Sequence, residues 1–235
     1  HVFRNGFRGW PAPVGVALST SSDGLTFSDS PDPLFDFSDV DYVGVAALAS
    51  SVVVDGDGTW VMYFYTWDDF VWPKAPSVIG RATAPAATGP WTADPTPVLL
   101  PGAPGSWDDL AVRSPSVVVD EDGIWHMWFA GAGADSAAIG HAVSADGISW
   151  TKDEAPVMVG EPDEWDQPFV HQPRVTVGPD GFVMAYAGVT TVTDSSAVVQ
   201  QHGLAVSADG ITWQRSATPA LSAIDAGGAN IWWTA

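Results

Sequence analysis

The sequence has no cysteine, few cations and no long hydrophobic run, and each shortage narrows what the chain can be. Without cysteine there are no disulfides and no thiolate metal sites. Eight Lys and Arg residues face 28 Asp and Glu residues, and the formal net charge of −20 repels nucleic acid and anionic lipid. The longest apolar stretch, VGVAALASSVVV from Val43, is too short and too rich in serine to span a bilayer. We therefore expect neither nucleic-acid binding nor membrane insertion.

Lysine is scarce, whereas tryptophan, glycine and proline are abundant. The chain holds 13 Trp, 24 Gly and 19 Pro among 235 residues. The exposed faces of helical proteins usually rely on Lys and Glu, so this composition does not suit a helical protein. It favours an all-β chain.

Two short elements repeat along the chain. The first is a β-branched run, an Asp-Gly turn and an aromatic-rich run, which begins at Ser50, Pro115 and Pro173, at intervals of 65 and 58 residues. The second is a Ser-x-Asp-Gly hairpin that falls between the copies of the first. It is found as SSDGLTF from Ser21, SADGISW from Ser144 and SADGITW from Ser207, with TAPAATGPW from Thr83 as a looser copy. Each repeat unit therefore has two hairpins, or four strands.

Four short strands per unit of about 60 residues, without helical periodicity, are typical of a β-propeller blade. We expect one domain over residues 1–235, with blades centred on residues 50–91, 113–152 and 172–215. In the second of these blades the pattern predicts strands A to D at residues 114–120, 124–130, 139–144 and 148–152. The DGDG and DEDG stretches lack the later ligands of a calcium loop, so we interpret them as hairpin turns.

The two ends of the chain align with the interiors of blades. HVFRNG from His1 matches HMWFAG from His126 in a B strand, and residues 229–235 look like a lone strand A. The sequence thus predicts a five-bladed propeller that is incomplete at both ends. The alternative is a four-bladed ring that is closed by joining the termini.

The two faces of such a propeller differ in their loops. The A–B and C–D turns of one face are tight, whereas the other face carries long loops rich in Trp and Asp, at residues 6–13, 66–77, 99–112 and 159–170. Long loops on a rigid scaffold are where binding is expected. The starts of the A strands open onto this same face, so we predict that Arg113, His171 and Arg174 line the mouth of the channel.

The stretch GSWDDLAVRSPSVVVDEDGIWHMWFAG, with IGHAVSADGISWTKDEAPVM after it, resembles the five-bladed propellers of glycoside hydrolase family 43 and, more distantly, family 32. The resemblance covers nearly the whole chain and consists of scaffold motifs, so it implies the fold more strongly than the activity. The SADGISW element is also similar to the Asp-box of sialidases, which is structural. A propeller of this kind implies carbohydrate as the partner and an extracellular or periplasmic location.

The family resemblance also implies where catalytic acids would stand. Family 43 uses three, at the starts of A strands, because glycosidic cleavage needs a proton donor and a carboxylate that activates water or attacks the sugar. The first falls in a segment that this sequence does not include, and the other two fall on Ser114 and His171. Neither is a carboxylate, which leaves enzyme status open. Asp109 and Glu164, together with His171, are the tentative substitutes.

Other polar and aromatic residues on the loop face have two interpretations each. The Trp-Asp pairs Trp107–Asp108 and Trp165–Asp166 either pin the loops between blades or contact sugar. Arg113 and Arg174 either pair with Asp108, Asp109 or Asp166, or bind a substrate carboxylate. Trp10, Trp67 and Trp72 either stack on sugar or plug their loops. His171 is a hydrogen-bonded channel residue or a contact to ligand or metal. We expect no cofactor, with a structural cation on the propeller axis as the alternative.

Three functions therefore remain open. The first is a glycan-directed protein that resembles family 43 and 32 hydrolases but has Ser114 and His171 at the usual acid positions. The second is a non-catalytic propeller that binds carbohydrate or another protein. The third is a purely structural propeller.

Overall fold

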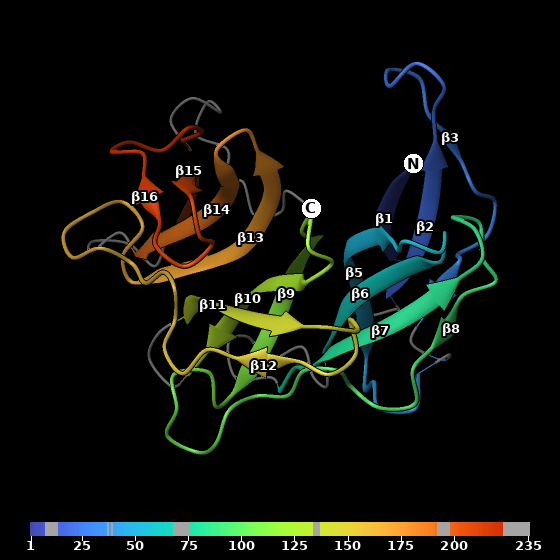
Figure 1. The fold of residues 1–235 in the computed structure, drawn as a ribbon, viewed down its shortest axis with the longest axis horizontal. Coiled ribbons are helices and arrows are strands. Elements are labelled where there is room, and N and C mark those ends of the chain that lie inside the picture. Colours follow the sequence, from blue (N-terminus) through green and yellow to red (C-terminus); the bar gives the residue numbers. More distant parts are fainter. Residues whose placement is uncertain are drawn as a thin grey trace. The chain divides into compact units, whose positions relative to one another are not determined.

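Strands are the regular elements of this chain, as the composition predicts. The computed structural model describes residues 1–7, 14–36, 38, 40–67, 76–133, 137–191 and 198–222, and it has sixteen strands there. Figure 1 draws these strands as arrows. None of the described residues belongs to a helix long and apolar enough to cross a membrane.

The strands belong to two compact units, His1–Leu100 and Pro101–Thr234, and each unit has one eight-stranded sheet (Figure 1). The strands of the first unit are β1 (Val2–Phe7), β2 (Val14–Thr20), β3 (Ser28–Asp29), β4 (Phe35–Asp36), β5 (Ala46–Val54), β6 (Trp60–Trp67), β7 (Ile79–Ala84) and β8 (Thr92–Ala93). Those of the second are β9 (Ala111–Val119), β10 (Trp125–Ala132), β11 (Ala137–Ser144), β12 (Thr151–Lys152), β13 (Phe169–Gly178), β14 (Gly181–Thr191), β15 (Val198–Ser207) and β16 (Gln214–Arg215).

Each sheet consists of antiparallel blades. Strands β5 to β8, β9 to β12 and β13 to β16 pair in sequence order as A, B, C and D, while β1, β2 and β3 supply B, C and D of a further blade. Neighbouring blades within a unit meet through one parallel pair, Val14 with Ala46 and Ala137 with Phe169. The fold is the β-propeller that the sequence predicts. The predicted lone strand at residues 229–235 lies outside the described residues.

Strand positions follow the sequence pattern closely. β10 begins one residue after the predicted start of strand B at Ile124, and β11 ends at Ser144 as predicted. The pairing of Val2 with Ser19 matches that of Met127 with Ala142, which confirms the alignment of His1 with His126.

The A–B turns after β5 and β9 are hairpins that close on an aspartate, Asp55 and Asp120. In the turn after β9, the Gly123 amide donates to the Asp120 carbonyl at 3.1 Å, and Gly123 has φ 79°, a left-handed conformation that favours glycine. The Asp120 carboxylate accepts the amides of Asp122 and Ile124. These contacts support the interpretation of the DEDG stretch as a turn.

The Ser-x-Asp-Gly turns between C and D strands are held by their own side chains. Asp146 Oδ1 accepts the amides of Ser149 and Ile148, each at 2.8 Å, and Ser144 Oγ accepts the amide of Gly147. The backbone amides lower the pKa of Asp146 to about 2. The turn therefore occupies residues 144–150, which is why β12 is shorter than the predicted strand D.

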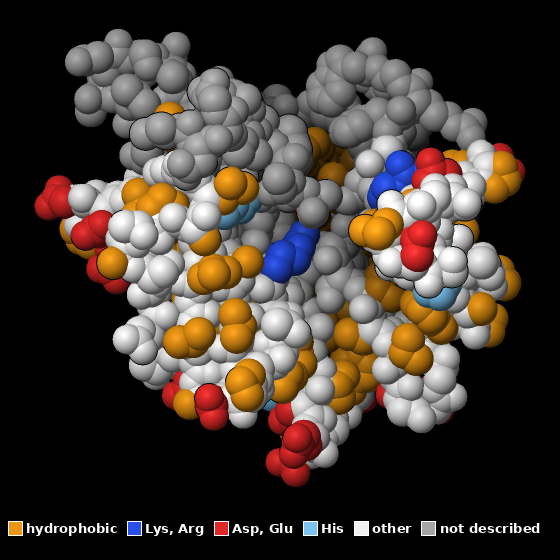
Figure 2. Space-filling model, turned by 90° about the horizontal axis from the view of Figure 1, so that it is seen from above, with side chains coloured by type: hydrophobic (Ala, Val, Ile, Leu, Met, Phe, Trp, Pro, Cys, Tyr) orange, Lys and Arg blue, Asp and Glu red, His pale blue; other side chains and the backbone are white. Residues whose placement is uncertain are grey.

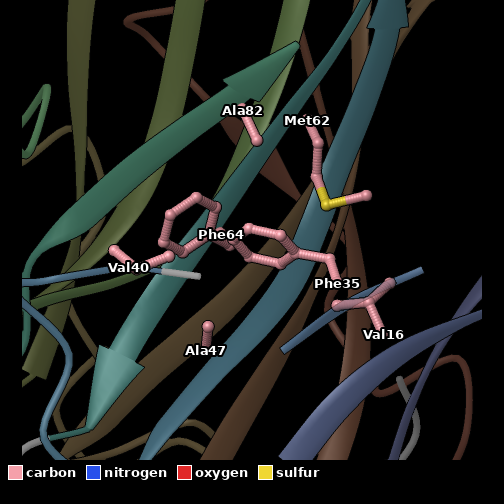
Figure 3. Packing of buried hydrophobic residues seen from close by; sticks show 7 residues of the cluster. All are labelled: Val16, Phe35, Val40, Ala47, Met62, Phe64 and Ala82. Atoms are coloured by element: carbon pink, nitrogen blue, oxygen red, sulfur yellow. The ribbon is translucent and has the colours of Figure 1, made fainter. Parts of the chain in front are cut away.

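Each unit has its own hydrophobic core. In the first unit, side chains from five strands and a loop meet: Val16, Phe35, Val40, Ala47, Met62, Phe64 and Ala82. Figure 3 shows the rings of Phe35 and Phe64 side by side at the centre of this cluster, with centroids 5.1 Å apart. In the second unit the core is built around Trp128, Tyr186 and Ile139. These cores hold the strands from which the candidate site projects.

Candidate functional site

The A strands β9 and β13 both bulge near their starts. Arg113 pairs with Ala130 and Ser116 with Trp128, so two residues of β9 lie opposite one residue of β10. β13 repeats this irregularity between His171 and Arg174. Ser114 and Gln172, at the bulges, have φ 49° and 53°, which is a strained conformation for residues other than glycine. Such strain often marks functional positions.

The bulges define which residues are equivalent in the two blades. Arg113 corresponds to His171, and Ser114 corresponds to Gln172. The two positions at which the family resemblance would place acids, Ser114 and His171, thus stand at neighbouring rather than identical places of the repeat.

At the level of the A-strand bulge, a row of paired residues crosses the strands of each blade. The chemistry of this row changes from blade to blade. In blade β5–β8 the row is Leu48, Tyr65, Ile79 and Leu99, and it is apolar apart from one hydroxyl. In blade β9–β12 it is Arg113, Ala130, Ile139 and Met158. In blade β13–β16 it is His171, Ala187, His202 and Leu221, which we call the His171 row. Two imidazoles stand where blade β5–β8 has Leu48 and Ile79, both of which are buried.

Glutamines extend this polar group. Gln200 Nε2 lies 3.3 Å from Gln172 Oε1, to which it donates, and 3.4 Å from His202 Nε2. Gln200 is two residues before His202 on β15, so both project from the same face of the strand. The His171 row and the two glutamines are half-buried apart from Ala187, which is fully buried between the histidines, and Leu221, which is exposed.

Both histidines of the row are held in the neutral form. Burial, His202 and Arg113 together lower the pKa of His171 to about 4, and burial lowers the pKa of His202. A neutral imidazole donates through one ring nitrogen and accepts through the other, as a glutamine amide does through its two ends. At neutral pH the cluster is therefore suited to uncharged groups that both donate and accept, such as hydroxyls.

The two arginines at the A strands lie close to this row. Arg113 is 5% exposed and acts electrostatically on His171. That both residues line the mouth of the channel stays a prediction. Arg174 is half-buried, and its Nη1 donates to the carbonyl of Pro173 at 2.9 Å. The β9 and β13 strands touch directly, because the Val175 amide donates to Ser116 Oγ at 2.9 Å.

Two of the three acids suggested as partners of these arginines, Asp108 and Asp166, pair with other cations. Asp108 is buried, accepts from Ser106 Oγ and forms an ion pair with Lys152 of β12. Asp166 is 2% exposed and accepts from Arg215 Nη1 of β16 at 2.9 Å and from the Tyr186 hydroxyl at 3.0 Å. Each carboxylate anchors its D–A loop to strands of the blade that follows the loop.

The tryptophans beside these acids complete the anchors. Trp107 stacks on Phe129 with centroids 5.9 Å apart, and Trp165 stacks on Tyr186 at 5.5 Å. Each indole covers a pair of glycines whose missing side chains leave room for it: Gly131 and Gly140 for Trp107, Gly188 and Gly203 for Trp165. These contacts support the interpretation of the Trp-Asp pairs as loop pins. Their contact with sugar stays a prediction.

Sequence reasoning missed a third copy of this pin. Tyr42 stacks on Phe64 at 6.3 Å and lies over Gly80, which occupies the position of Gly140 and Gly203 in its blade. The signal was the glycine repeated at this place in the C strand. It was hidden because the ring is a tyrosine and no Asp follows it.

The tentative catalytic acids take other places. Asp109 is half-buried and accepts the Gly105 amide at 2.7 Å, so it shapes its own loop, and Glu164 is exposed. Trp67 is half-buried at the end of β6, where it pairs with Ala46. Trp10 and Trp72 lie outside the described residues.

Metal ligands are not gathered in the part of the chain that the structure describes. No group of three or more His, Asp or Glu side chains there is arranged to hold a metal ion, and the titratable side chains that act on His171 are His202 and Arg113. A hollow at the β2–β3 turn is lined by Thr20, Ser22 and Asp23, but its polar groups serve the turn itself. On the face drawn in Figure 2, acidic side chains lie toward the edges and Lys and Arg side chains are few, in keeping with the net charge of −20.

Comparisons with known proteins agree with this fold. No family model matches the sequence, and no curated protein sequence matches it. Among solved structures, a glycosyl hydrolase from Bacteroides ovatus superposes with a TM-score of 0.71 at 19% identity, over 93% of this chain and 67% of its own. The β-1,2-mannobiose phosphorylase from Listeria innocua, in complex with β-1,2-mannobiose, gives 0.65 at 18% identity, over 92% of this chain and 56% of its own.

A family 117 glycoside hydrolase from Zobellia galactanivorans also matches, with a TM-score of 0.60 at 17% identity, over 72% of this chain and 55% of its own. These similarities establish a glycoside-hydrolase-like propeller fold, and families 130 and 117 share the five-bladed form. The chain spans 66% of the length of the first matched structure. The particular resemblance to family 43 or 32 stays a prediction.

Proposed function

We propose that this propeller is a glycan-directed protein whose carbohydrate site is the His171 row with Gln172 and Gln200. The observation that carries the proposal is the replacement of Leu48 and Ile79 of one blade by His171 and His202 of another, at equivalent places of the same repeat. The two half-buried imidazoles bring groups that donate and accept hydrogen bonds to places where the other blade has aliphatic side chains. Such groups are suited to the hydroxyls of a sugar.

The ligand chemistry follows from the donors and acceptors. Neutral imidazoles and amides bind hydroxyl-rich, uncharged groups. Because these side chains project from strands, the site does not need mobile loops to position them. The matched structures bear names of enzymes that act on glycosides, one of them on β-1,2-mannobiose. We therefore place neutral oligosaccharides, with β-1,2-mannobiose among the first to test, ahead of anionic ones.

Binding without hydrolysis is the form of this function that the residues support best. Ser114 cannot act as an ionised carboxylate, and a histidine with a pKa of about 4 is mostly deprotonated at neutral pH and so is a poor proton donor there. We expect little or no turnover of aryl arabinofuranosides, xylosides or mannosides by the purified chain. Turnover that is abolished by Asp109→Asn or Glu164→Gln would instead show that the D–A loops supply substitute acids.

Calorimetry on a panel of neutral oligosaccharides tests the proposal with a matched pair of variants. His202→Ile introduces the residue that Ile79 and Ile139 supply at the same place, so the fold should tolerate it. We expect binding to weaken at least about tenfold, as loss of one or two hydrogen bonds implies. The control is His126→Val, which introduces the residue found at Val61 and Val183 and should leave binding unchanged.

Two outcomes would contradict the proposal. If no oligosaccharide of the panel binds the wild-type chain, the glycan-directed function is wrong. If binding occurs and both His202→Ile and His171→Leu retain it, the function stands but the site is elsewhere.

A further inference from the structure

Four titratable side chains form a hydrogen-bonded row across blade β9–β12, outside the proposed site. Asp120 Oδ2 lies 3.1 Å from His126 Nε2, His126 Nδ1 lies 3.1 Å from His141 Nε2, and His141 Nδ1 lies 2.9 Å from Asp153 Oδ2. The row joins the A–B turn, β10, β11 and the segment after β12. Every ring nitrogen of both histidines has a partner in it.

The two imidazoles meet through their nitrogens rather than through their faces. Their centroids are 5.4 Å apart and their planes are inclined by 26°, while the facing nitrogens are 3.1 Å apart. The nitrogens therefore lie between the ring centres, where their in-plane lone pairs or protons point at one another. If one of the two facing nitrogens carries a proton, they form a hydrogen bond. If neither carries a proton, their two lone pairs repel each other.

Counting protons gives the charge of the row. Three contacts need three protons, whereas two neutral imidazoles bring only two, and both of those are required by the carboxylates at the ends. We propose that this row is a proton-binding site, in which the folded chain holds one extra proton between His126 and His141. The row then carries an imidazolium and two carboxylates, with a net charge of −1.

The repeat supports a cation at this place. The position of His141 is held by Arg81 in blade β5–β8, and that of Asp153 by Asp94. Arg81 Nη1 donates to both oxygens of Asp94, at 3.1 and 2.9 Å. In the other blades the position is Leu18 or Leu204. The His141–Asp153 contact is thus a titratable form of an ion pair that another blade makes permanently.

The two histidines of the row are more buried than the carboxylates at its ends. His141 is 3% exposed, His126 15%, Asp120 28% and Asp153 41%. Trp128 stacks on His126, and Phe182 of β14 covers it at 5.7 Å. Burial lowers the pKa of His141 against the opposing effect of Asp153. The charged groups that act on His141 are Asp153 and His126.

The consequence is a stability that depends on pH. Because the folded row binds one proton that unfolded histidines release above about pH 6.5, its contribution is fully present below that pH and is lost as the pH rises further. His171 and His202, whose pKa values are lowered, act in the opposite direction. The effect of the row must therefore be measured against variants that keep those two histidines.

The proton itself is observable by nitrogen NMR of chain labelled at its five histidines. At about pH 7.5, above the usual range of histidine titration, we expect three protons over the four ring nitrogens of His126 and His141. His126→Val and His141→Leu assign the signals, and both introduce residues that other blades carry at these places. Two neutral rings at that pH, with two protons in all, would overturn the proposal.

Thermal unfolding gives a second reading. Between about pH 5.5 and 8.5, the wild-type Tm should fall by about 3 °C more than that of the His126→Val, His141→Leu double variant, since about 1 kcal/mol moves Tm by 2–4 °C at this size. Equal Tm profiles of the wild type and the double variant would contradict the proposal, as two neutral rings in the NMR spectrum would. A His202→Ile variant should show a fall in Tm at least as large as that of the wild type, because it leaves the row intact and removes a histidine that acts in the opposite direction.

Discussion

At the scale of single residues, the buried acids of the long loops have structural partners. Asp166 is 2% exposed and accepts from Arg215 and Tyr186, so it is a structural anchor. We expect Asp166→Ala to destabilise the chain by about 3 kcal/mol, because Arg215 would be left partly buried without its main partner. Glu161 lies 3.4 Å from the same arginine but is 54% exposed, and Glu161→Gln should cost less than about 0.5 kcal/mol. Urea unfolding curves of both variants decide the comparison, and similar losses would show that Asp166 is no anchor.

The lowered pKa of His171 predicts how stability changes at acidic pH. Its folded-state pKa of about 4 lies below that of an unfolded histidine, so the neutral form is the one that the fold prefers. The stability linked to it is fully present above about pH 6.5 and is lost as the pH falls toward 4. His171→Leu, which introduces the residue found at Leu48, should flatten the unfolding free energy over this window. A steeper profile for the variant would mean that His171 is protonated in the native state.

At the level of strands and loops, the aromatic pins depend on glycine. A Cβ on Gly203 would lie 2.6 Å from Trp165 and 3.0 Å from Tyr186. We expect Gly203→Ala to cost about 1–3 kcal/mol by overpacking, and the cost to shrink in a Trp165→Ala background. Gly56→Ala, where nothing lies within 4 Å, is the matched control. Additive losses in the double variant would contradict the pin.

The same elements show what sequence could and could not predict. The hairpins were predictable because Asp-Gly turns and alternating strands are local signals. The left-handed conformations of Ser114 and Gln172 were not, since a bulge depends on how two strands pair. His202 was not predictable because it lies on a C strand, where only the paired register sets it beside Ala187 and His171. Tyr42 was not predicted because its loop has a tyrosine in place of the Trp-Asp pair.

On the scale of the whole molecule, the blades repeat one scaffold and differ in one row. Blade β5–β8 has an almost wholly apolar row, blade β9–β12 has an arginine in it, and blade β13–β16 has two histidines. Loops pinned by Trp165–Asp166 and Trp107–Asp108 hold the scaffold rigid around it. Rigid placement of polar groups is what a binding site requires, because flexible groups lose entropy when a ligand orders them. We therefore expect the His171 row to bind the ligand and the pinned loops to stabilise the fold.

The most direct test of this assignment is the nitrogen NMR spectrum of the five histidines during titration with an oligosaccharide that binds. The account predicts that the signals of His171 and His202 shift together and saturate, because a bound sugar replaces water at their ring nitrogens. The signals of His126 and His141 should stay in place, since their nitrogens are already engaged within blade β9–β12. Saturable binding that leaves His171 and His202 unmoved would contradict the central claim.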